Sequence, residues 1–300
     1  MRFRQLWAIL ILLSAAMGDC ACSIKRNVNV PVPARILQAR TATFQELVDL
    51  IDSYTLKIHS LTSTTMRVTL RSGKLESGRL QEYRSAPGYI LLERPDSIRL
   101  IIQNPITKTA ILDLASVGDD FSIWSPTENK FYVGRNSMKE LGVEGSTKTP
   151  NFSARPIHIF RAILPPALPP EGEAGYGTGM EEAQDAVTKY YIMPVYRIEG
   201  GGRLVPVRKY WIDRADLTIA RQQTYENEGR LAGILSYSRF SMVDGVQLPL
   251  TIRIERPLDN YSLDLEFKNW RVNPQFPGDA FVLTPPPGAE RIQLREKQAP

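Results

Sequence analysis

Few side chains in this sequence could carry catalysis. The 300 residues include only two histidines and two cysteines, and both cysteines lie near the N-terminus. His59 sits in the strand-like KIHSL and His158 in the apolar PIHIF, where a packed histidine is commoner than a general base. No Gly-x-Ser-x-Gly elbow or metal-ligand spacing occurs. The acidic pairs Asp119-Asp120 and Glu181-Glu182 fall in turns or loops, which favours solvated carboxylates. We therefore expect a binding protein without cofactor or metal, and not an enzyme.

The chain begins with a segment typical of export. The basic residues Arg2 and Arg4 precede an apolar run from Leu6 to Met17, which is too short to span a bilayer comfortably. This is the pattern of a secretory signal peptide. We predict that residues 1–21 are removed and that the mature protein leaves the cytoplasm.

The two cysteines follow the apolar run in GDCACSIKRN. A disulfide between Cys20 and Cys22 would be strained, because one residue separates them. The segment resembles the lipobox of bacterial lipoproteins, whose cysteine receives diacylglycerol. Cys22 follows a small alanine but has Asp19 where an aliphatic residue is usual, whereas Cys20 has Met17 in that place and Asp19 directly before it. We predict lipidation at Cys22, with Cys20 as the alternative. Ordinary cleavage after Gly18, leaving free or oxidised thiols, is the other interpretation.

Residues 22–40 carry valine, proline and basic residues without a helical period. They predict an extended tether that would hold a folded body off a membrane. The net charge of +5 at pH 7 is spread along the chain. Because no block of lysine and arginine with interleaved aromatic residues occurs, the sequence does not indicate nucleic-acid binding. We expect a monomer that contacts the membrane through its N-terminal lipid.

Residues 41–290 are the predicted folded body. TFQELVDLIDSY contains a capping-box pair, Thr43 and Glu46, followed by apolar residues at helical spacing, and predicts a helix. Short segments rich in β-branched and aromatic residues follow on both sides of residues 137–187, separated by turn residues. This spacing favours a mainly β (α+β) protein with an antiparallel sandwich or barrel-like sheet.

A different kind of segment lies between the two strand-rich halves. SARPIHIFRAIL predicts a short apolar helix over residues 154–164, with Ser153 as its cap and Pro156 in its first turn. Residues 165–187 are rich in proline, glycine and acid and are predicted to form a flexible loop; residues 291–300 would be a C-terminal tail. Such a helix suits a movable lid, and the alternative is a core helix that closes one end of the sheet. As a lid, it would contact ligand through Ile157, Phe160, Ile163 and Leu164.

The segment LLERPDSIRLIIQNPITKTAILDLASVGDDFSIWSPTENKF resembles the central sequence of the lipoprotein carriers of the Lol system. The shared features are an Arg-Pro that ends a strand, a following strand that ends in proline, a Gly/Asp turn and an aromatic-rich strand. FVLTPPPGAE near the C-terminus and the helix from Thr43 are also similar. The resemblance to this LolA/LolB-like superfamily runs from about Thr41 to Glu290.

The resemblance implies a strongly curved, incompletely closed antiparallel β-barrel, or half-barrel. An N-terminal helix and a lid helix would cover a hydrophobic cavity for acyl chains. It also implies that Arg94 hydrogen-bonds to the lid and keeps the cavity closed, with Pro95 ending the strand and Ile98 facing the cavity. The alternative is an exposed arginine in a surface turn. Strand alternation adds Trp124 and Phe131 as candidate cavity residues.

Three functions fit these observations. The first is a lipid-anchored envelope protein that binds acyl chains of lipoproteins or lipids, for lipoprotein sorting to the outer membrane, on whose periplasmic face it would lie. The second is an envelope module that senses or binds lipid or lipoprotein without transport. The third is an unrecognised hydrolase. The expected lipid anchor resembles the receptor of the Lol system more than its soluble carrier, and the lid segment is longer and richer in proline than in that family.

Overall fold

The computed structural model describes residues 33–73, 81–138, 141–143, 154–170 and 173–296. The expected signal peptide, both cysteines and residues 22–32 of the expected tether lie outside the described residues. One compact unit begins at Ala34. Within the described ranges, no helix combines the length and apolar character that crossing a membrane requires.

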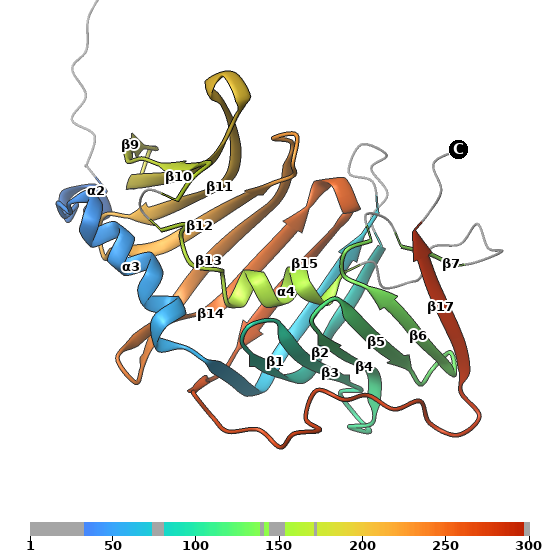
Figure 1. Cartoon of the computed structure of the whole chain (residues 1–300). Helices are drawn as coiled ribbons and strands as arrows, with labels where there is room; N and C mark the ends of the chain where they lie inside the picture. Colours follow the sequence, from blue (N-terminus) through green and yellow to red (C-terminus); the bar gives the residue numbers. More distant parts are fainter. Residues whose placement is uncertain (1–32, 74–80, 139–140, 144–153, 171–172, 297–300) are drawn as a thin grey trace, which may run out of the picture. The chain divides into compact units, whose positions relative to one another are not determined.

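The described part of the chain forms one large, mostly antiparallel sheet that does not close into a barrel (Figure 1). The strands pair in the order β10 to β15, then β1 to β6, then β17 and β7, with β8 and β9 both on the free side of β10. The strands are β1 Ser60–Ser72, β2 Gln81–Glu93, β3 Ser97–Gln103, β4 Ala110–Val117, β5 Asp120–Ser125, β6 Lys130–Arg135, β7 Leu141–Val143, β8 Tyr176–Thr178, β9 Glu181–Gln184, β10 Lys189–Glu199, β11 Arg203–Asp213, β12 Thr218–Tyr225, β13 Leu231–Val243, β14 Val246–Arg256, β15 Tyr261–Phe267, β16 Arg271–Val272 and β17 Glu290–Glu296.

Strand β1 joins the two halves of the sheet that the sequence predicted. It pairs with β15 through Val68 and Leu265 and with β2 through Leu61 and Leu92. All four side chains are buried in the inner core. Leu61 and Val68 share the inner face because the register shifts between Ser63 and Met66, which resets the alternation along β1. The mainly β fold with an open, half-barrel sheet agrees with the prediction.

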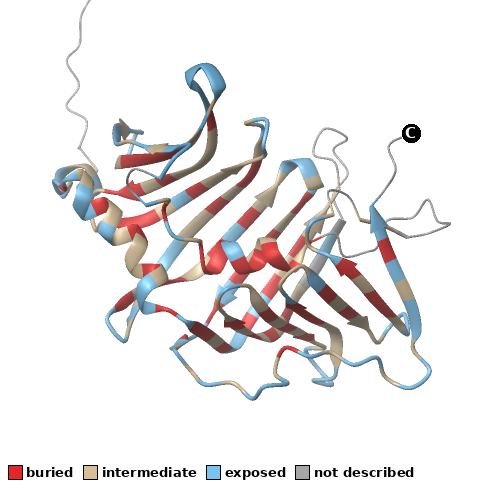
Figure 2. Ribbon diagram, viewed as in Figure 1, coloured by how far each residue is buried: buried red, intermediate tan, exposed pale blue. Residues whose placement is uncertain are grey.

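Helices cover this inner face. They are α3 Phe44–Lys57 and α4 Pro156–Ile163. The short helix α2 Ala34–Leu37 has no buried residue, and short 3₁₀ turns lie at Gly200–Gly202 and Pro257–Asp259. Helix α3 begins where the sequence predicted: the Thr43 hydroxyl accepts from the Glu46 amide at 3.3 Å, and the Glu46 carboxylate accepts from the Thr43 amide at 2.7 Å. Figure 2 shows buried residues along α4 and along the strands behind it.

The structure differs from the sequence prediction at three segments. The expected loop 165–187 contains β8 and β9, which add to the edge of β10. The expected tail contains β17, which pairs in parallel with β6. The end of the expected tether contains α2, where Arg35 donates to Asp213 at 3.0 Å. The partners of α2 and β17 lie far away in sequence, so local composition could not reveal them. Strand β9 instead forms a hairpin with the strand that follows it, β10, which the proline, glycine and acid content of residues 165–187 concealed.

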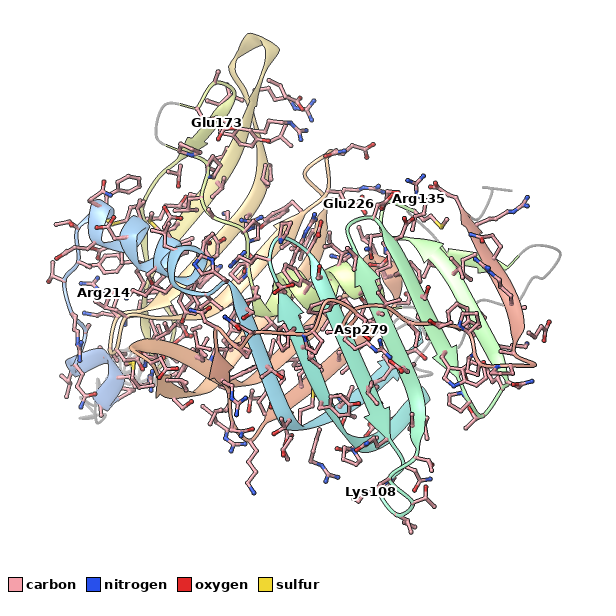
Figure 3. The ribbon with its side chains drawn as sticks, turned by 60° about the horizontal axis from the view of Figure 1, so that its bottom comes forward. Lys108, Arg135, Glu173, Arg214, Glu226 and Asp279 are labelled. Atoms are coloured by element: carbon pink, nitrogen blue, oxygen red, sulfur yellow. The ribbon has the colours of Figure 1, made fainter. Side chains whose placement is uncertain are left out.

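The outer face of β3 to β6 is covered by the segment 273–289 between β16 and β17. Arg99, on that face, donates to the carbonyl oxygen of Val282 at 2.6 Å, and the rings of Phe276 and Phe281 meet edge to face at 5.5 Å. Figure 3 shows Asp279 of this segment in front of the strands. Apolar side chains on the outer face of β4 and β6 can therefore be buried without belonging to the inner core.

Candidate functional site: a cavity beneath helix α4

Helix α4 lies across the inner face of the sheet and contacts β3, β4 and β14 (Figure 1). Pro156 occupies its first turn, which needs no amide donor, and Arg155 is the residue before it. Ser153, the predicted cap, lies outside the described residues. Six of the eight helix residues are buried, namely Pro156, Ile157, Ile159, Phe160, Ala162 and Ile163. A helix this apolar is stable only where protein or another apolar phase surrounds it.

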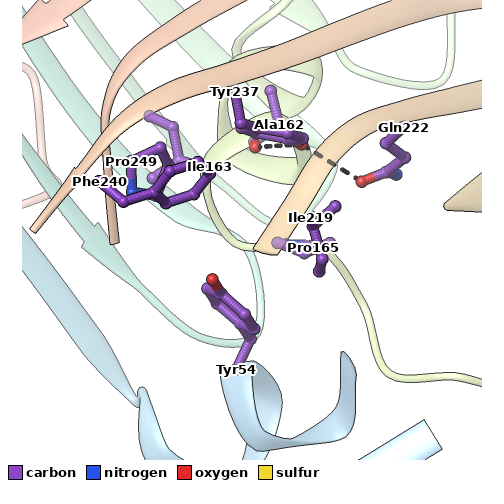
Figure 4. A pocket seen from close by; sticks show the side chains of 9 residues that line it. All are labelled: Tyr54, Ala162, Ile163, Pro165, Ile219, Gln222, Tyr237, Phe240 and Pro249. Carbon is purple, nitrogen blue, oxygen red and sulfur yellow. Dashed lines mark hydrogen bonds between the residues drawn. The ribbon is translucent and has the colours of Figure 1, made fainter. Parts of the chain in front are cut away.

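A cavity lies beside the C-terminal half of α4 (Figure 4). Its internal volume is about 20 Å³, and it opens to solvent on one side. Its wall is formed by helices α3 and α4, by Pro165 shortly after α4, and by strands β12 to β14. The lining residues are Tyr54, Ala162, Ile163, Pro165, Ile219, Gln222, Tyr237, Phe240 and Pro249.

The wall of the cavity is uncharged at neutral pH. Tyr54 donates to the carbonyl oxygen of Gln247, and burial raises its pKa to about 12. The Tyr237 hydroxyl lies 2.9 Å from the carbonyl oxygen of Ala162 and 3.3 Å from Oε1 of Gln222, and burial raises its pKa strongly. Both phenols therefore stay neutral. A pocket that is apolar apart from a few hydrogen-bonding groups suits hydrocarbon better than a charged substrate.

The Arg94 side chain links the end of α4 to the end of α3 through two hydrogen bonds. Its Nε donates to the carbonyl oxygen of Ile58 at 2.9 Å, and an Nη donates to that of Pro165 at 3.1 Å. The acceptor Pro165 is one residue beyond the helix predicted from the sequence. Partial burial lowers the pKa of the Arg94 guanidinium, which remains charged because the ordinary pKa of arginine is so high.

Two further groups hold the chain just after α4. An Nη of Arg208 donates to the Tyr210 hydroxyl at 2.9 Å and lies 3.4 Å from the carbonyl oxygen of Pro166. The Leu168 amide donates to the Asp52 carboxylate of α3 at 3.0 Å. The last turn of α4 and residues 164–168 are thus fixed by a small number of polar contacts.

A second set of polar contacts holds the N-terminal end of α4. Arg155 pairs with Asp259 at 3.0 Å, and Asp259 also accepts from Arg256 at 2.8 Å. His158 shares a 2.9 Å hydrogen bond with the Tyr261 hydroxyl. Burial, and then the nearby positive charges of Arg256 and Arg155, hold the pKa of His158 well below its usual range. This histidine is neutral at physiological pH and anchors the helix.

The structure brings together most of the residues that the sequence singled out. Ile98 is fully buried on the inner face of β3, which α4 contacts. The four predicted lid residues are also buried in the inner core, but only Ile163 lines the cavity in this closed state. The sequence did not point to Gln222, Tyr237 or Arg208, because nothing local distinguishes them from other strand residues.

Trp124 and Phe131 lie elsewhere. They are register partners on β5 and β6, and the neighbouring pair Ile123 and Tyr132 occupies the inner face. Phe131 is only 2% exposed, yet it lies outside the inner core, on the face that residues 273–289 cover. Alternation correctly places the two side chains on one face but cannot say which face. We therefore leave both out of the proposed lining.

Comparison with known proteins gives likenesses of fold. Residues 244–295 match the model of a family described as a predicted periplasmic protein. No match was found among curated proteins.

Three solved structures are similar over most of both chains. A DUF1329 family protein from Desulfovibrio piger is 14% identical, with 80% of this chain and 98% of that chain covered and a TM-score of 0.49. A LolA superfamily protein from Nitrosomonas europaea is 14% identical, with 81% and 99% covered and a TM-score of 0.47. A domain from Vibrio parahaemolyticus named for outer membrane lipoprotein sorting is 11% identical, with 79% and 97% covered and a TM-score of 0.48.

Proposed function

We propose that this protein binds the acyl chains of lipoproteins or other lipids in the cavity beneath α4. The observation that carries the proposal is a small, uncharged and largely apolar cavity whose roof is a buried apolar helix held by a few polar contacts. The finer form of the proposal, transport of lipoproteins toward the outer membrane, is supported by the resemblance of the sequence around Arg94 to the Lol carriers.

Binding an acyl chain requires α4 to move, because the closed cavity has an internal volume of only about 20 Å³, enough for about one water molecule. Exposing the four large apolar side chains of α4 to water would cost about 6–12 kcal/mol at roughly 1.5–3 kcal/mol each. Burying one acyl chain of about sixteen carbons would return roughly 13 kcal/mol at about 0.8 kcal/mol per CH₂. These two terms are similar in size, so a single chain can take the place of α4 against the sheet.

We place the protein in the periplasm, anchored through an N-terminal lipid to the outer membrane. The basic and apolar N-terminal segment and the lipobox-like cysteines support this location. The periplasmic description of the family that matches residues 244–295 is consistent with it.

A fluorescent fatty acyl probe tests the proposal when its binding is measured on three variants. Ala162→Phe and Ile219→Phe each fill the cavity, one from α4 and one from β12, while Val117→Phe adds the same ring at a position that is 52% exposed. We expect both cavity variants to bind at least about tenfold more weakly than wild type, with the control unchanged. Overpacking costs typically 1–3 kcal/mol, so thermal unfolding must first show that the variants fold. Equal binding by all folded variants would reject the cavity as the site.

A further inference from the structure

Three arginines gather around the end of α4. Arg94 donates to the carbonyl oxygen of Pro165, and Arg208 contacts that of Pro166, the next residue. Arg161 lies in the last turn of α4, four residues before Pro165, and its side chain is exposed. Pro165 itself lines the cavity. Three positive charges therefore surround the stretch of chain that borders the cavity.

These arginines lack the carboxylate partners that most buried arginines have in this protein. Arg155 and Arg256, for example, pair with Asp259 at the other end of α4. Across the ranges that the structure describes, Arg94, Arg161 and Arg208 form no ion pair within 4.0 Å. Their acceptors are the neutral oxygens of Ile58, Pro165, Pro166 and Tyr210.

The two acids nearby form no ion pair with the cluster, and their two charges against three arginines leave a net positive charge. Asp52 accepts from the Leu168 amide, and Asp96 accepts from the Gly118 amide. Arg161 feels the charge of Arg208 as well as that of Asp96: burial and Arg208 lower its pKa, and Asp96 opposes this. Guanidiniums without an ion-pair partner, two of which are partly buried here (Arg94 and Arg208), bind carboxylate or phosphate well, because a planar guanidinium can donate two parallel hydrogen bonds to such an anion.

The cluster also lies next to the cavity wall. Arg208 donates to Tyr210, which pairs in register with the cavity residue Gln222. The charge of Arg208 acts on Tyr237, another lining residue. A chain buried between α3, α4 and β12 to β14 would therefore place its head at the arginines, with Gln222 and Tyr237 available to an ester or amide group.

We propose that Arg94, Arg161 and Arg208 bind the anionic head, a carboxylate or phosphate, of the acyl ligand, and that this anion takes the place of the Pro165 and Pro166 carbonyls and so releases α4. This inference rests on the proposed function. Charge-assisted hydrogen bonds are roughly twice as strong as those to neutral acceptors, so the exchange favours the liganded, open state. The arginines thereby act both as the latch of the closed lid and as the head-group site of the open one.

The test compares three amphiphiles with the same saturated chain: a fatty acid, a monoacyl phosphate and a fatty alcohol. For wild type we expect both anions to bind at least about tenfold more tightly than the alcohol, and the difference to shrink at high salt. The double variant Arg161→Gln/Arg208→Gln should lose this preference while still binding the alcohol. Arg221→Gln, an exposed outer-face arginine over Trp211, is the matched control and should behave like wild type.

The possible failures are distinguishable. Equal binding of all three amphiphiles by wild type, or an unchanged preference in the double variant, overturns the head-group site but leaves acyl binding intact. Binding of none of them overturns both. Inorganic phosphate alone separates lipid from free anion: if it binds wild type as tightly as the monoacyl phosphate does, the site serves a free anion and the coupling to an acyl chain is wrong.

Discussion

Replacing Arg94 with leucine removes the one side chain, among the described residues, that hydrogen-bonds both to the end of α3 and to the end of α4. The two bonds lost are those to Ile58 at 2.9 Å and Pro165 at 3.1 Å. The Arg94 amide still donates to the His59 carbonyl at 2.8 Å, so the turn between β2 and β3 keeps its backbone contact. Bonds from a charged donor are worth about 1.5–3 kcal/mol, which we take as the total because the site is partly solvated.

This loss should shift the lid equilibrium toward the open state by roughly 10- to 150-fold. A lid that is about 1% open in wild type would then be open in roughly 10% to 60% of the molecules. We expect Arg94→Leu to bind an uncharged acyl ligand, such as the fatty alcohol, at least as tightly as wild type but to release it slowly to acceptor vesicles, because closure of α4 helps to expel the chain.

Three measurements check this prediction: equilibrium affinity, transfer rate and amide hydrogen exchange over residues 156–168. Exchange should be faster in Arg94→Leu. The matched control is Arg67→Leu, an exposed arginine on the outer face of β1 that contacts Ser85. If affinity, transfer and exchange in Arg94→Leu all equal those of wild type, Arg94 belongs to an ordinary turn and the latch is refuted.

Three further predictions follow from other parts of the chain. Cys22→Ala should release the protein into the soluble periplasmic fraction, while Cys20→Ala stays membrane-bound. The reverse result would place the lipid anchor at Cys20, and no effect of either substitution would exclude a lipid anchor at these cysteines. Ligand should change tryptophan emission through Trp270, whose Nε1 donates to the cavity residue Pro249 at 2.8 Å, so Trp270→Phe should abolish the change and Trp124→Phe should not; the opposite result would place ligand near β5. Burial lowers the pKa of His158 in the folded protein, so as pH falls the unfolded chain is protonated at this residue before the folded one. The free energy of unfolding should therefore decrease below about pH 6.5, by at most about 1.4 kcal/mol per pH unit. Urea unfolding of wild type and His158→Gln between pH 4 and 8 should show this slope in wild type only, and equal slopes would exclude the histidine as its source.

Sequence reasoning succeeded where the determining contacts are local. Thr43 and Glu46 lie three residues apart, so the start of α3 could be predicted from them, and the apolar period of residues 156–163 identified α4. Arg94 was singled out through resemblance alone, since composition equally allowed an exposed turn.

The remainder depended on long-range partners. Strand β17 forms because β6, far away in sequence, offers an unpaired edge. Strands β8 and β9 pair with the next strand, β10, but their glycine-rich and acidic composition is typical of a loop and hid this local pairing. For Trp124 and Phe131, alternation fixed their common face, but the choice of face depended on which side α4 and residues 273–289 cover.

Mass spectrometry of lipid that co-purifies with the native protein tests the central claim most directly. The account predicts an acyl lipid bound to wild type, and a much smaller amount bound to folded Ala162→Phe, in which the added ring occupies the cavity. Wild-type protein that carries no acyl lipid, or equal amounts of lipid on the two proteins, would contradict acyl binding beneath α4.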